Sequence, residues 1–394
     1  MIAPLRARPL PPLRPATAAV LAEGRVDHDA IARNIGRLRA ASGREVMAVV
    51  KADAFGHGAA EVARTALRSG AGWLGVATID EALALRSAGI DAPIFAWLVD
   101  PWCDLEDAIR ERITLSCPNV ETLLAIENAA AAAATARPVD IHLEIDTGMA
   151  RGGAAPASWD DLCFLAARVQ RSGLVHVTGL WSHLALAARP SATSVADAVA
   201  RFTQAISAAS AAGLAPTELH LANSAGALAH PSTAFTMVRS GAAIYGIETV
   251  DGHSFGLEPA LRLTSRVTQL RAVPAETGVG YLHAYRTNEA SMLALVPLGY
   301  GDGVPRSLSH GGWVSICGRE YPIRGSISMD QLVVEVDTRV SLGDEVVLLG
   351  AGVDNEPTVQ DWATLAGTIP HDILSGLGAR ISRTHRGLTN ERTR

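Results

Sequence analysis

The chain has 394 residues and a net charge of −6 at pH 7, with 48% hydrophobic and 19% charged residues. This length predicts two domains, and the apolar fraction is enough to fill large buried cores. No basic segment is dense enough to suggest a nucleic-acid surface, and no apolar run approaches membrane-spanning length. We therefore expect small-molecule partners, with no nucleic acid and no membrane.

The amino-terminal segment and the cysteines predict a cytoplasmic protein. The first twenty residues carry Arg6, Arg8 and Arg14 among several prolines, without the continuous apolar run of a secretory signal. We expect residues 1–16 to form a flexible extension. The four cysteines form no CxxC pair and no metal-ligand spacing, which is typical of reduced thiols in a cytosolic enzyme, and we predict no metal site.

Short strand-like runs alternate with alanine-rich, helix-favouring segments up to about residue 255. The predicted strands are Val46–Lys51, Trp73–Thr78, Pro93–Leu98, Ile113–Ser116, Val139–Asp146, Val175–Ser182, Glu218–Ala222 and Met237–Ser240. Eight strand–helix units in about 230 residues predict an α/β fold, a (β/α)8 TIM-type barrel over residues 17–255.

The pattern changes after residue 255, where apolar or alternating runs lie between Gly, Pro and Asp breaks. These runs are Arg262–Val273, Ser291–Leu298, Trp313–Ile316, Gln331–Asp337 and Glu345–Leu349. They predict a mostly antiparallel β domain over residues 256–394, interrupted by one helix at about Val359–Leu365.

One lysine, Lys51, stands against thirty-three arginines. A lysine amine can lose its proton and attack a carbonyl carbon, whereas a guanidinium stays charged, so arginine could not replace a lysine with that role. The apolar run Val46–Val50 places Lys51 at the end of a predicted strand. Lys51 is therefore a candidate covalent anchor; the alternative is a lysine retained by chance in a buried strand.

Polar residues also follow the other predicted strands of the first domain. In barrel enzymes the chemistry lies at the carboxyl ends of the strands. The residues expected at those ends are Lys51, Asp146, Arg151, His183, Asn223, Ser224 and Arg239. Together they predict an active site at that end of the barrel.

Several ordered motifs resemble the pyridoxal-phosphate-dependent alanine racemase family over about residues 27–383. They are Ala48-Val-Val-Lys-Ala-Asp-Ala-Phe-Gly-His-Gly58, His142-Leu-Glu-Ile-Asp-Thr-Gly-Met-Ala-Arg151, Trp181-Ser-His-Leu-Ala185, His220-Leu-Ala-Asn-Ser224, Val238-Arg-Ser-Gly-Ala-Ala-Ile-Tyr-Gly246, Val296-Pro-Leu-Gly-Tyr-Gly-Asp-Gly303 and Ser328-Met-Asp-Gln331. The resemblance implies the barrel and β domain predicted above, with the first strand, at about Thr17–Leu21, joining the β domain.

The resemblance also implies a two-base racemase, with alanine as the first-choice substrate. Lys51 would hold pyridoxal 5'-phosphate covalently and exchange the Cα proton on one face, and Tyr300 would exchange it on the other. In the family this tyrosine comes from the β domain of the partner subunit, which implies a head-to-tail homodimer with shared active sites. A tyrosine has a pKa near 10, so it needs cations and hydrogen bonds to act as a base, and His183 is the expected supporter.

Further roles follow from the resemblance, position by position. Arg239 would face the pyridine nitrogen; His183 would pack on the ring; Asn223, Ser224, Gly241 and Ala242 would bind the cofactor, with Ser224 and Gly241 at its phosphate. Arg151 and Met329 would bind the substrate carboxylate, with Glu144 and Asp330 as supporting residues. Glu144 stands where many members carry a carbamylated lysine, so it would supply a permanent negative charge to Arg151.

Three departures concern the phosphate and the substrate entrance. Phe55 and His371, both at cofactor-binding positions, replace tyrosines, and Ser326 replaces an arginine of the entrance corridor. A wider pocket could admit serine or another larger or more polar amino acid, which is the alternative substrate. Two other functions stay open: an amino-acid decarboxylase with the same domain plan, although its usual carboxyl-terminal cysteine motif is absent, and a non-catalytic cofactor-binding protein.

Overall fold

The computed structural model describes residues 21–189 and 193–387, which form two compact units. The barrel unit comprises residues 29–54 and 58–258. The β unit takes the described residues of Met1–His28, Phe55–His57 and Pro259–Arg394. The predicted extension, residues 1–16, and most of the expected strand Thr17–Leu21 lie outside the described residues.

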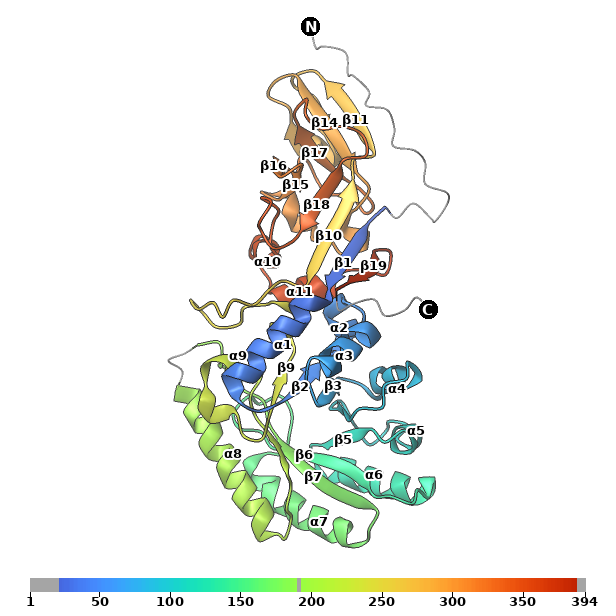
Figure 1. Ribbon diagram of the computed structural model, residues 1–394, viewed down its shortest axis with the longest axis vertical. Helices are drawn as coiled ribbons and strands as arrows, with labels where there is room; N and C mark the ends of the chain where they lie inside the picture. The colour runs from blue at the N-terminus through green and yellow to red at the C-terminus, as the bar shows by residue number, and fades with distance from the viewer. Residues whose placement is uncertain (1–20, 190–192, 388–394) are drawn as a thin grey trace. The chain divides into compact units, whose positions relative to one another are not determined.

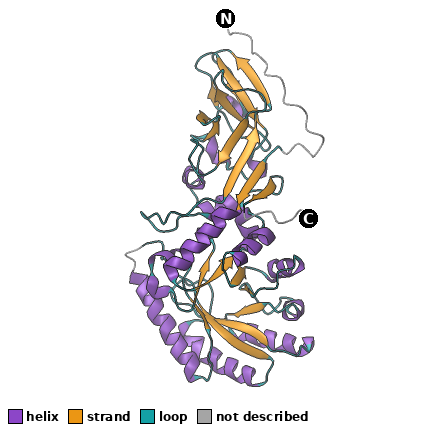
Figure 2. Cartoon of the chain, in the orientation of Figure 1, coloured by secondary structure: helices purple, strands orange, loops and turns teal. Residues whose placement is uncertain are grey.

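The barrel unit contains eight parallel strands in a near-closed ring (Figures 1 and 2). Their order is β8-β7-β6-β5-β4-β3-β2-β9. The two end strands approach each other, because the Thr236 and Arg239 amides donate to the carbonyls of Leu219 and Ala222 at 3.0 and 2.9 Å. The strands are β2 (Glu45–Val49), β3 (Trp73–Val76), β4 (Ile94–Ala96), β5 (Thr114–Cys117), β6 (Val139–Glu144), β7 (Val175–Trp181), β8 (Glu218–His220) and β9 (Met237–Ser240). The predicted barrel fold is confirmed.

Helices follow the strands and surround them in Figure 2. They are α1 (His28–Ser42), α2 (Lys51–Gly56), α3 (Ala59–Arg68), α4 (Ile79–Ser87), α5 (Glu106–Arg110), α6 (Val120–Ala133), α7 (Trp159–Arg171), α8 (Thr193–Ala211) and α9 (Ser224–Ala229), with the short turn η3 (Ala242–Tyr245) after β9. Local sequence sets several of their starts: the side chains of Thr78, Asn119 and Asn223 accept backbone N–H groups at the beginnings of α4, α6 and α9.

The barrel interior is filled by large side chains. Met47, Phe95, Trp181 and Met237 form a buried cluster, and Trp73 packs against it. Each comes from a strand, as expected for the layered core of a barrel. Buried polar side chains also meet this cluster: His142 of β6 stacks on Phe95, and the Trp181 ring N–H donates to the Ser116 hydroxyl at 2.9 Å.

The β unit is mostly antiparallel. Its sheets run β16-β15-β18-β10-β1-β19, β11-β14-β17 and β12-β13, and β1 pairs with β19 in parallel. The strands are β1 (Glu23–Asp27), β10 (Leu261–Arg266), β11 (Gln269–Val273), β12 (Gly278–Val279), β13 (Tyr285–Arg286), β14 (Ser291–Val296), β15 (Trp313–Ile316), β16 (Arg319–Pro322), β17 (Leu332–Val336), β18 (Glu345–Leu349) and β19 (Ser382–Arg386). The predicted run Arg262–Val273 forms two strands, β10 and β11. The predicted helix is α10 (Val359–Ala366), and a second helix that we did not predict, α11 (Pro370–Ser375), follows it.

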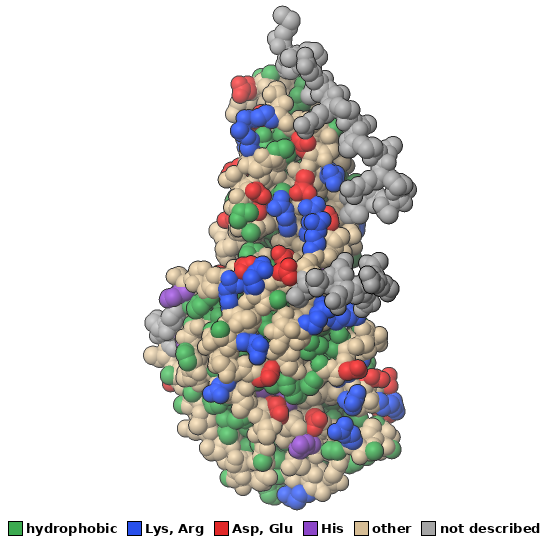
Figure 3. All heavy atoms as spheres, in the orientation of Figure 1, with side chains coloured by type: hydrophobic (Ala, Val, Ile, Leu, Met, Phe, Trp, Pro, Cys, Tyr) green, Lys and Arg blue, Asp and Glu red, His purple; other side chains and the backbone are tan. Residues whose placement is uncertain are grey.

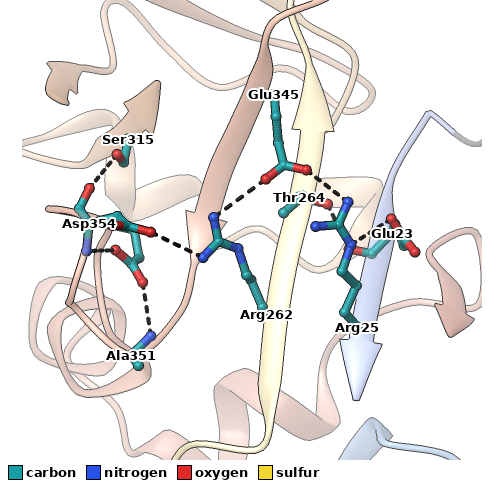
Figure 4. Close-up of polar contacts among 9 residues, drawn as sticks. Glu23, Arg25, Arg262, Thr264, Ser315, Glu345, Ala351 and Asp354 are labelled. Atoms are coloured by element: carbon teal, nitrogen blue, oxygen red, sulfur yellow. Dashed lines mark hydrogen bonds and ion pairs between the residues drawn. The ribbon is translucent and has the colours of Figure 1, made fainter. Parts of the chain in front are cut away.

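Ion pairs attach β1 to the sheet of the β unit (Figure 4). Arg25 of β1 contacts Glu345 of β18 at 2.7 Å, and Glu345 also contacts Arg262 of β10 at 3.4 Å. Arg25 has a second partner in Glu23, 2.8 Å away. The first strand of the described chain is thus bound to the β unit through side chains as well as through its backbone.

Charged side chains of both signs are interspersed over the face drawn in Figure 3. Neither sign covers a continuous area there. Among the described residues no helix is long and apolar enough to cross a membrane, and in the same residues no group of His, Cys, Asp or Glu side chains is arranged to hold a metal ion.

Candidate active site

Lys51 stands just beyond the carboxyl end of β2, as predicted. The N–H of the preceding residue, Val50, donates to the carbonyl oxygen of Gly75 in β3 at 2.9 Å. The chain is therefore hydrogen-bonded to the neighbouring strand as far as the residue before the lysine. The amine lies 5.4 Å from the centre of the Trp97 ring. Burial and the positive charge of Arg151 lower the pKa of Lys51, which favours the neutral amine that can attack a carbonyl carbon.

The backbone after Lys51 is left-handed. The φ angles of Ala52, Asp53, Ala54 and Phe55 are 50, 50, 55 and 53°. L-residues disfavour this conformation by about 1–2 kcal/mol each, so consecutive left-handed residues persist only when surrounding contacts hold them. Strain of this kind is typical of functional sites, and here it begins at the residue next to the candidate anchor.

Glu144 is the last residue of β6, and Asp146 and Arg151 belong to the turn that follows it. Asp146 Oδ1 accepts the N–H groups of Gly148 and Met149 at 2.8 and 2.9 Å and so shapes the turn that leads to Arg151. Burial raises the pKa of Glu144 to about 7, although the charges of Arg239 and Arg151 oppose that rise. Asp146 therefore binds backbone N–H groups of the turn. Glu144 is the carboxylate that interacts electrostatically with Arg239 and Arg151.

Arg239 is buried and fully engaged by hydrogen bonds on both of its terminal nitrogens. Nη1 donates to the carbonyl of His220 at 2.6 Å and Nη2 to that of Ser182 at 2.5 Å. Nη2 also lies 3.1 Å from Nδ1 of His183. Burial lowers the pKa of Arg239 to about 9, with Glu144 opposing the shift, so the guanidinium remains a cation and a donor at neutral pH.

Two histidines that the sequence analysis did not single out extend this hydrogen-bonded group. His220 Nδ1 lies 3.1 Å from Arg239 Nη1, and His220 Nε2 lies 2.9 Å from Nδ1 of His142. Burial and then the charge of Arg239 lower the pKa of His183 and of His142 to about 3. All these rings are therefore neutral at working pH. Their sequence signal was a histidine inside each of two strand-like runs.

Ser224, Gly241 and Ala242 meet at the start of η3. The hydroxyls of Ser224 and Ser240 are 3.0 Å apart, and the Ala243 N–H donates to Ser224 at 3.2 Å. Hydroxyls and backbone N–H groups of this kind suit an anionic group such as a phosphate. Asn223 was predicted to bind the cofactor. In the structure its Oδ1 accepts the Gly226 N–H at 3.0 Å and so caps α9.

The β unit brings the turns of Tyr300 and Met329 together. The Tyr300 N–H donates to Ser328 O at 3.1 Å, and the Gly301 N–H donates to Met329 O at 2.8 Å. Tyr300 is 41% exposed and Met329 54% exposed. The two predicted substrate-facing residues are thus neighbours on one surface of this unit.

Phe55 and His371 also meet within the β unit. Their ring centres are 5.7 Å apart at an angle of 48°. The two residues that replace tyrosines in the family pattern therefore contact each other.

A second exposed tyrosine, Tyr281, was missed from the sequence. It is 71% exposed and lies between Gly280 at a φ of 70° and Leu282 at a φ of 58°. A Cβ atom on Gly280 would lie 3.2 Å from the Ser326 N atom, so this turn packs beside the segment that leads to Met329. The sequence signal available was a glycine directly before an isolated tyrosine in a predicted loop.

Comparison with known proteins gives one consistent result. The family models described as alanine racemase, N-terminal domain, and alanine racemase, C-terminal domain, match residues 26–249 and 260–385. The alanine racemase of Salinispora arenicola (strain CNS-205) is 45% identical over 368 residues, covering 93% of this chain and 98% of the relative. That of Thermobifida fusca (strain YX) is 44% identical over 369 residues, covering 93% and 98%.

Solved structures agree with the sequence relatives. The alanine racemase from D-cycloserine-producing Streptomyces lavendulae matches with a TM-score of 0.89 and 39% identity, over 93% of this chain and 97% of that one. The alanine racemase from Bartonella henselae with covalently bound pyridoxal phosphate matches with a TM-score of 0.84 and 28% identity, over 94% and 100%.

Proposed function

The chain belongs to the alanine racemase family and is a pyridoxal-phosphate-dependent racemase of alanine, and we propose that it moves the Cα proton with two bases, Lys51 and a tyrosine of the β unit. The observation that carries this proposal is the single lysine at the end of β2. Its amine has a lowered pKa, and the residues that follow it have a strained, left-handed backbone. No comparison favours serine, a decarboxylase or a non-catalytic protein.

The barrel unit fits pyridoxal phosphate. The Ser224 and Ser240 hydroxyls and the start of η3 offer donors for a phosphate, and Lys51 offers an amine for the aldehyde carbon. When bound, the cofactor withdraws electrons from the amino acid and so acidifies its Cα–H bond. Arg239 is a cation whose terminal nitrogens are held by His220 and Ser182. Its Nε–H would donate to the ring nitrogen and keep that nitrogen unprotonated.

Arg151 is the proposed ligand of the substrate carboxylate. Because burial raises the pKa of Glu144 to about 7, its carboxylate would orient the guanidinium in the ionised form, which predominates above that pH. Asp146 fixes the turn on which Arg151 stands. Met329 of the partner subunit would offer its backbone N–H to the same carboxylate, with Asp330 supporting the turn. These contacts would hold the Cα–H bond in line with the two bases.

The second base must approach the face opposite Lys51. The sequence predicts Tyr300, and exposure and backbone conformation favour Tyr281 as a second candidate. Tyr281 is the more exposed of the two, and its neighbours Leu282 and His283 hold φ angles of 58 and 47°. Tyr285 is a poor candidate, because its hydroxyl donates to Glu335 at 2.9 Å. A tyrosine that serves another subunit has to project from its own.

A head-to-tail homodimer is part of the proposal. Tyr281, Leu282 and Met329 are 71, 99 and 54% exposed in the single chain. Soluble monomers rarely expose several large apolar side chains in one region, so a second copy of the chain is the expected cover. Each active site would then combine a lysine of one subunit with a tyrosine of the other.

The test measures deuterium incorporation at Cα and optical inversion for Tyr281→Phe and Tyr300→Phe. Loss of the true base should reduce racemisation by about 10²–10⁴-fold, while Lys51 still exchanges the proton of one enantiomer. The other variant serves as the matched control and should racemise at a rate close to that of the unmodified enzyme. Unchanged racemisation in both variants would rule out a tyrosine from either turn.

Mixing two inactive variants tests the shared site. Lys51→Ala combined with the inactive tyrosine variant should recover about a quarter of normal activity, since half of the randomly formed dimers carry one intact site of two. No recovery, with both variants shown to exchange subunits, would place the lysine and the tyrosine of each site on the same chain.

A further inference from the structure

The carboxylate of Glu81 connects the residue after Lys51 to the neighbouring strand. Its Oε1 accepts the N–H of Ala52 at 2.6 Å. Its Oε2 accepts the N–H groups of Ala77 and Thr78 at 2.8 and 3.3 Å. Ala77 and Thr78 follow β3, which pairs with β2 up to Val49 opposite Gly75. One side chain thus joins the carboxyl ends of two adjacent strands at the lysine.

Ordinary helix capping explains only part of this arrangement. Glu81 is the third residue of α4 and forms a capping box with Thr78, whose hydroxyl accepts the Glu81 N–H at 3.2 Å. The capping box uses Oε2. The bond from Ala52 to Oε1 lies outside it and comes from a different strand–helix connection.

The bond to Ala52 falls where the left-handed segment begins. Other contacts of the barrel unit hold its later part: Ala54 donates to Val50 O at 2.8 Å, and the Ala59 N–H donates to Asp53 Oδ1 at 2.8 Å. Glu81 acts one residue from Lys51 itself. A charged acceptor makes a stronger bond than a neutral one, which suits a strained position.

We propose that Glu81 is a positioning residue for Lys51, which fixes the left-handed backbone at Ala52 so that the amine keeps its place beside the reacting carbon. This proposal rests on the proposed role of Lys51 as cofactor anchor and proton carrier. The negative charge of Glu81 also raises the pKa of Lys51, against the lowering by burial and Arg151. Glu81 therefore has a geometric effect and an electrostatic effect on the same amine.

Three variants separate these effects. In Glu81→Gln only one oxygen remains, so either the Ala52 bond or the bonds at Ala77 and Thr78 are lost, together with the charge. Glu81→Asp keeps the charge but is too short to span both sides. Thr78→Ala removes the hydroxyl of the capping box and leaves the bond from Ala52 to Glu81 available, so it is the control for a purely structural loss.

Two readouts are measured for each variant: the split between kcat and KM for alanine with the cofactor bound, and the protonation of the free Lys51 amine before the cofactor is added. The second is accessible because the chain has one lysine, so lysine labelled with ¹⁵N at Nζ gives a single resonance that can be titrated. Glu81→Gln should lower kcat by about tenfold or more, with a smaller change in KM, and should shift the titration midpoint to lower pH. Glu81→Asp should restore the midpoint but not kcat.

Two results would overturn the proposal. One is Glu81→Gln behaving like Thr78→Ala in both kcat and midpoint, which would leave Glu81 as a cap alone. The other is an unchanged kcat in Glu81→Asp, which would mean that Glu81 acts through its charge alone and not by holding the backbone at Ala52. Borohydride reduction of the unmodified enzyme, followed by peptide mass spectrometry, tests the premise separately: a cofactor adduct absent from Lys51 would refute the proposed function itself.

Discussion

The hydroxyl of Tyr245 donates a hydrogen bond to the carbonyl oxygen of Val49 at 2.9 Å. Val49 is the last residue of β2, two residues before Lys51, and Tyr245 is the last residue of η3, which begins at the expected phosphate site. This bond therefore links the element that would bind the phosphate to the strand that presents the lysine.

Removal of that hydroxyl in Tyr245→Phe should lower the free energy of unfolding by about 1–2 kcal/mol, because Tyr245 is only 2% exposed and a buried carbonyl would lose its donor. Urea unfolding at saturating cofactor measures the loss. Tyr285→Phe is the matched control, since its hydroxyl bonds a partly exposed carboxylate of the β unit, and it should cost less. An equal loss in both variants would contradict a special contribution from the Val49 bond.

Glu144 should make the unfolding free energy fall as pH rises towards neutrality. Burial raises the pKa of Glu144 from 4.5 to about 7, so the folded protein binds a proton that the unfolded chain has released. The stabilisation is complete below pH 4.5 and is lost as pH rises through about 7. Unfolding measured from pH 4 to pH 8 should show a flatter profile in Glu144→Gln. The exposed residue Glu61, changed to Gln, should leave the profile as it is.

The buried histidines should act in the opposite direction, at acid pH. Burial and the charge of Arg239 lower the pKa of His142 from 6.5 to about 3, so the unfolded chain takes up a proton that the folded protein rejects. This contribution is present above pH 6.5 and is lost as pH falls towards 3. His142→Gln should make acid unfolding less steep, without removing the slope, because His183 and His220 remain. His253→Gln, at an exposed position, is the control.

Arg380 joins the turns of Tyr300 and Met329. Its Nε lies 2.8 Å from Oδ1 of Asp302, and its Nη1 lies 2.7 Å from Oδ1 of Asp330. In Arg380→Gln the two turns should separate more easily, so KM for alanine should rise several-fold, more than kcat falls. Steady-state kinetics in both directions measure the split. Arg339→Gln, which removes a pair with the nearby Asp337, should have no such effect.

The predicted strands of the barrel agree closely with the observed ones because both faces of such strands are buried. Val46–Lys51 and Met237–Ser240, for example, differ from β2 and β9 by no more than two residues at each end. In the β unit prediction was weaker. The strand Ser382–Arg386 contains no apolar residue and exists through its pairing with β1, a contact between the two ends of the chain.

Residue chemistry by itself made Lys51 the candidate anchor, because an amine in an arginine-rich chain points to carbonyl chemistry whatever the fold. The motifs likewise led to Arg151, His183, Ser224 and Arg239. Sequence could not find residues whose importance comes from their neighbours: Glu81 has the local signature of a helix cap, and only the pairing of β2 with β3 brings its second oxygen to Ala52.

The sequence determined the kind of chemistry and the order of the elements, since these depend on residue types and on periodicity along the chain. The tertiary structure alone decided which groups share one electrostatic environment. Burial and the approach of Arg239 and Arg151 set the pKa of Glu144 and of His183, and both depend on distances between strands far apart in sequence. A pattern of residues carries no such distances until the chain has folded.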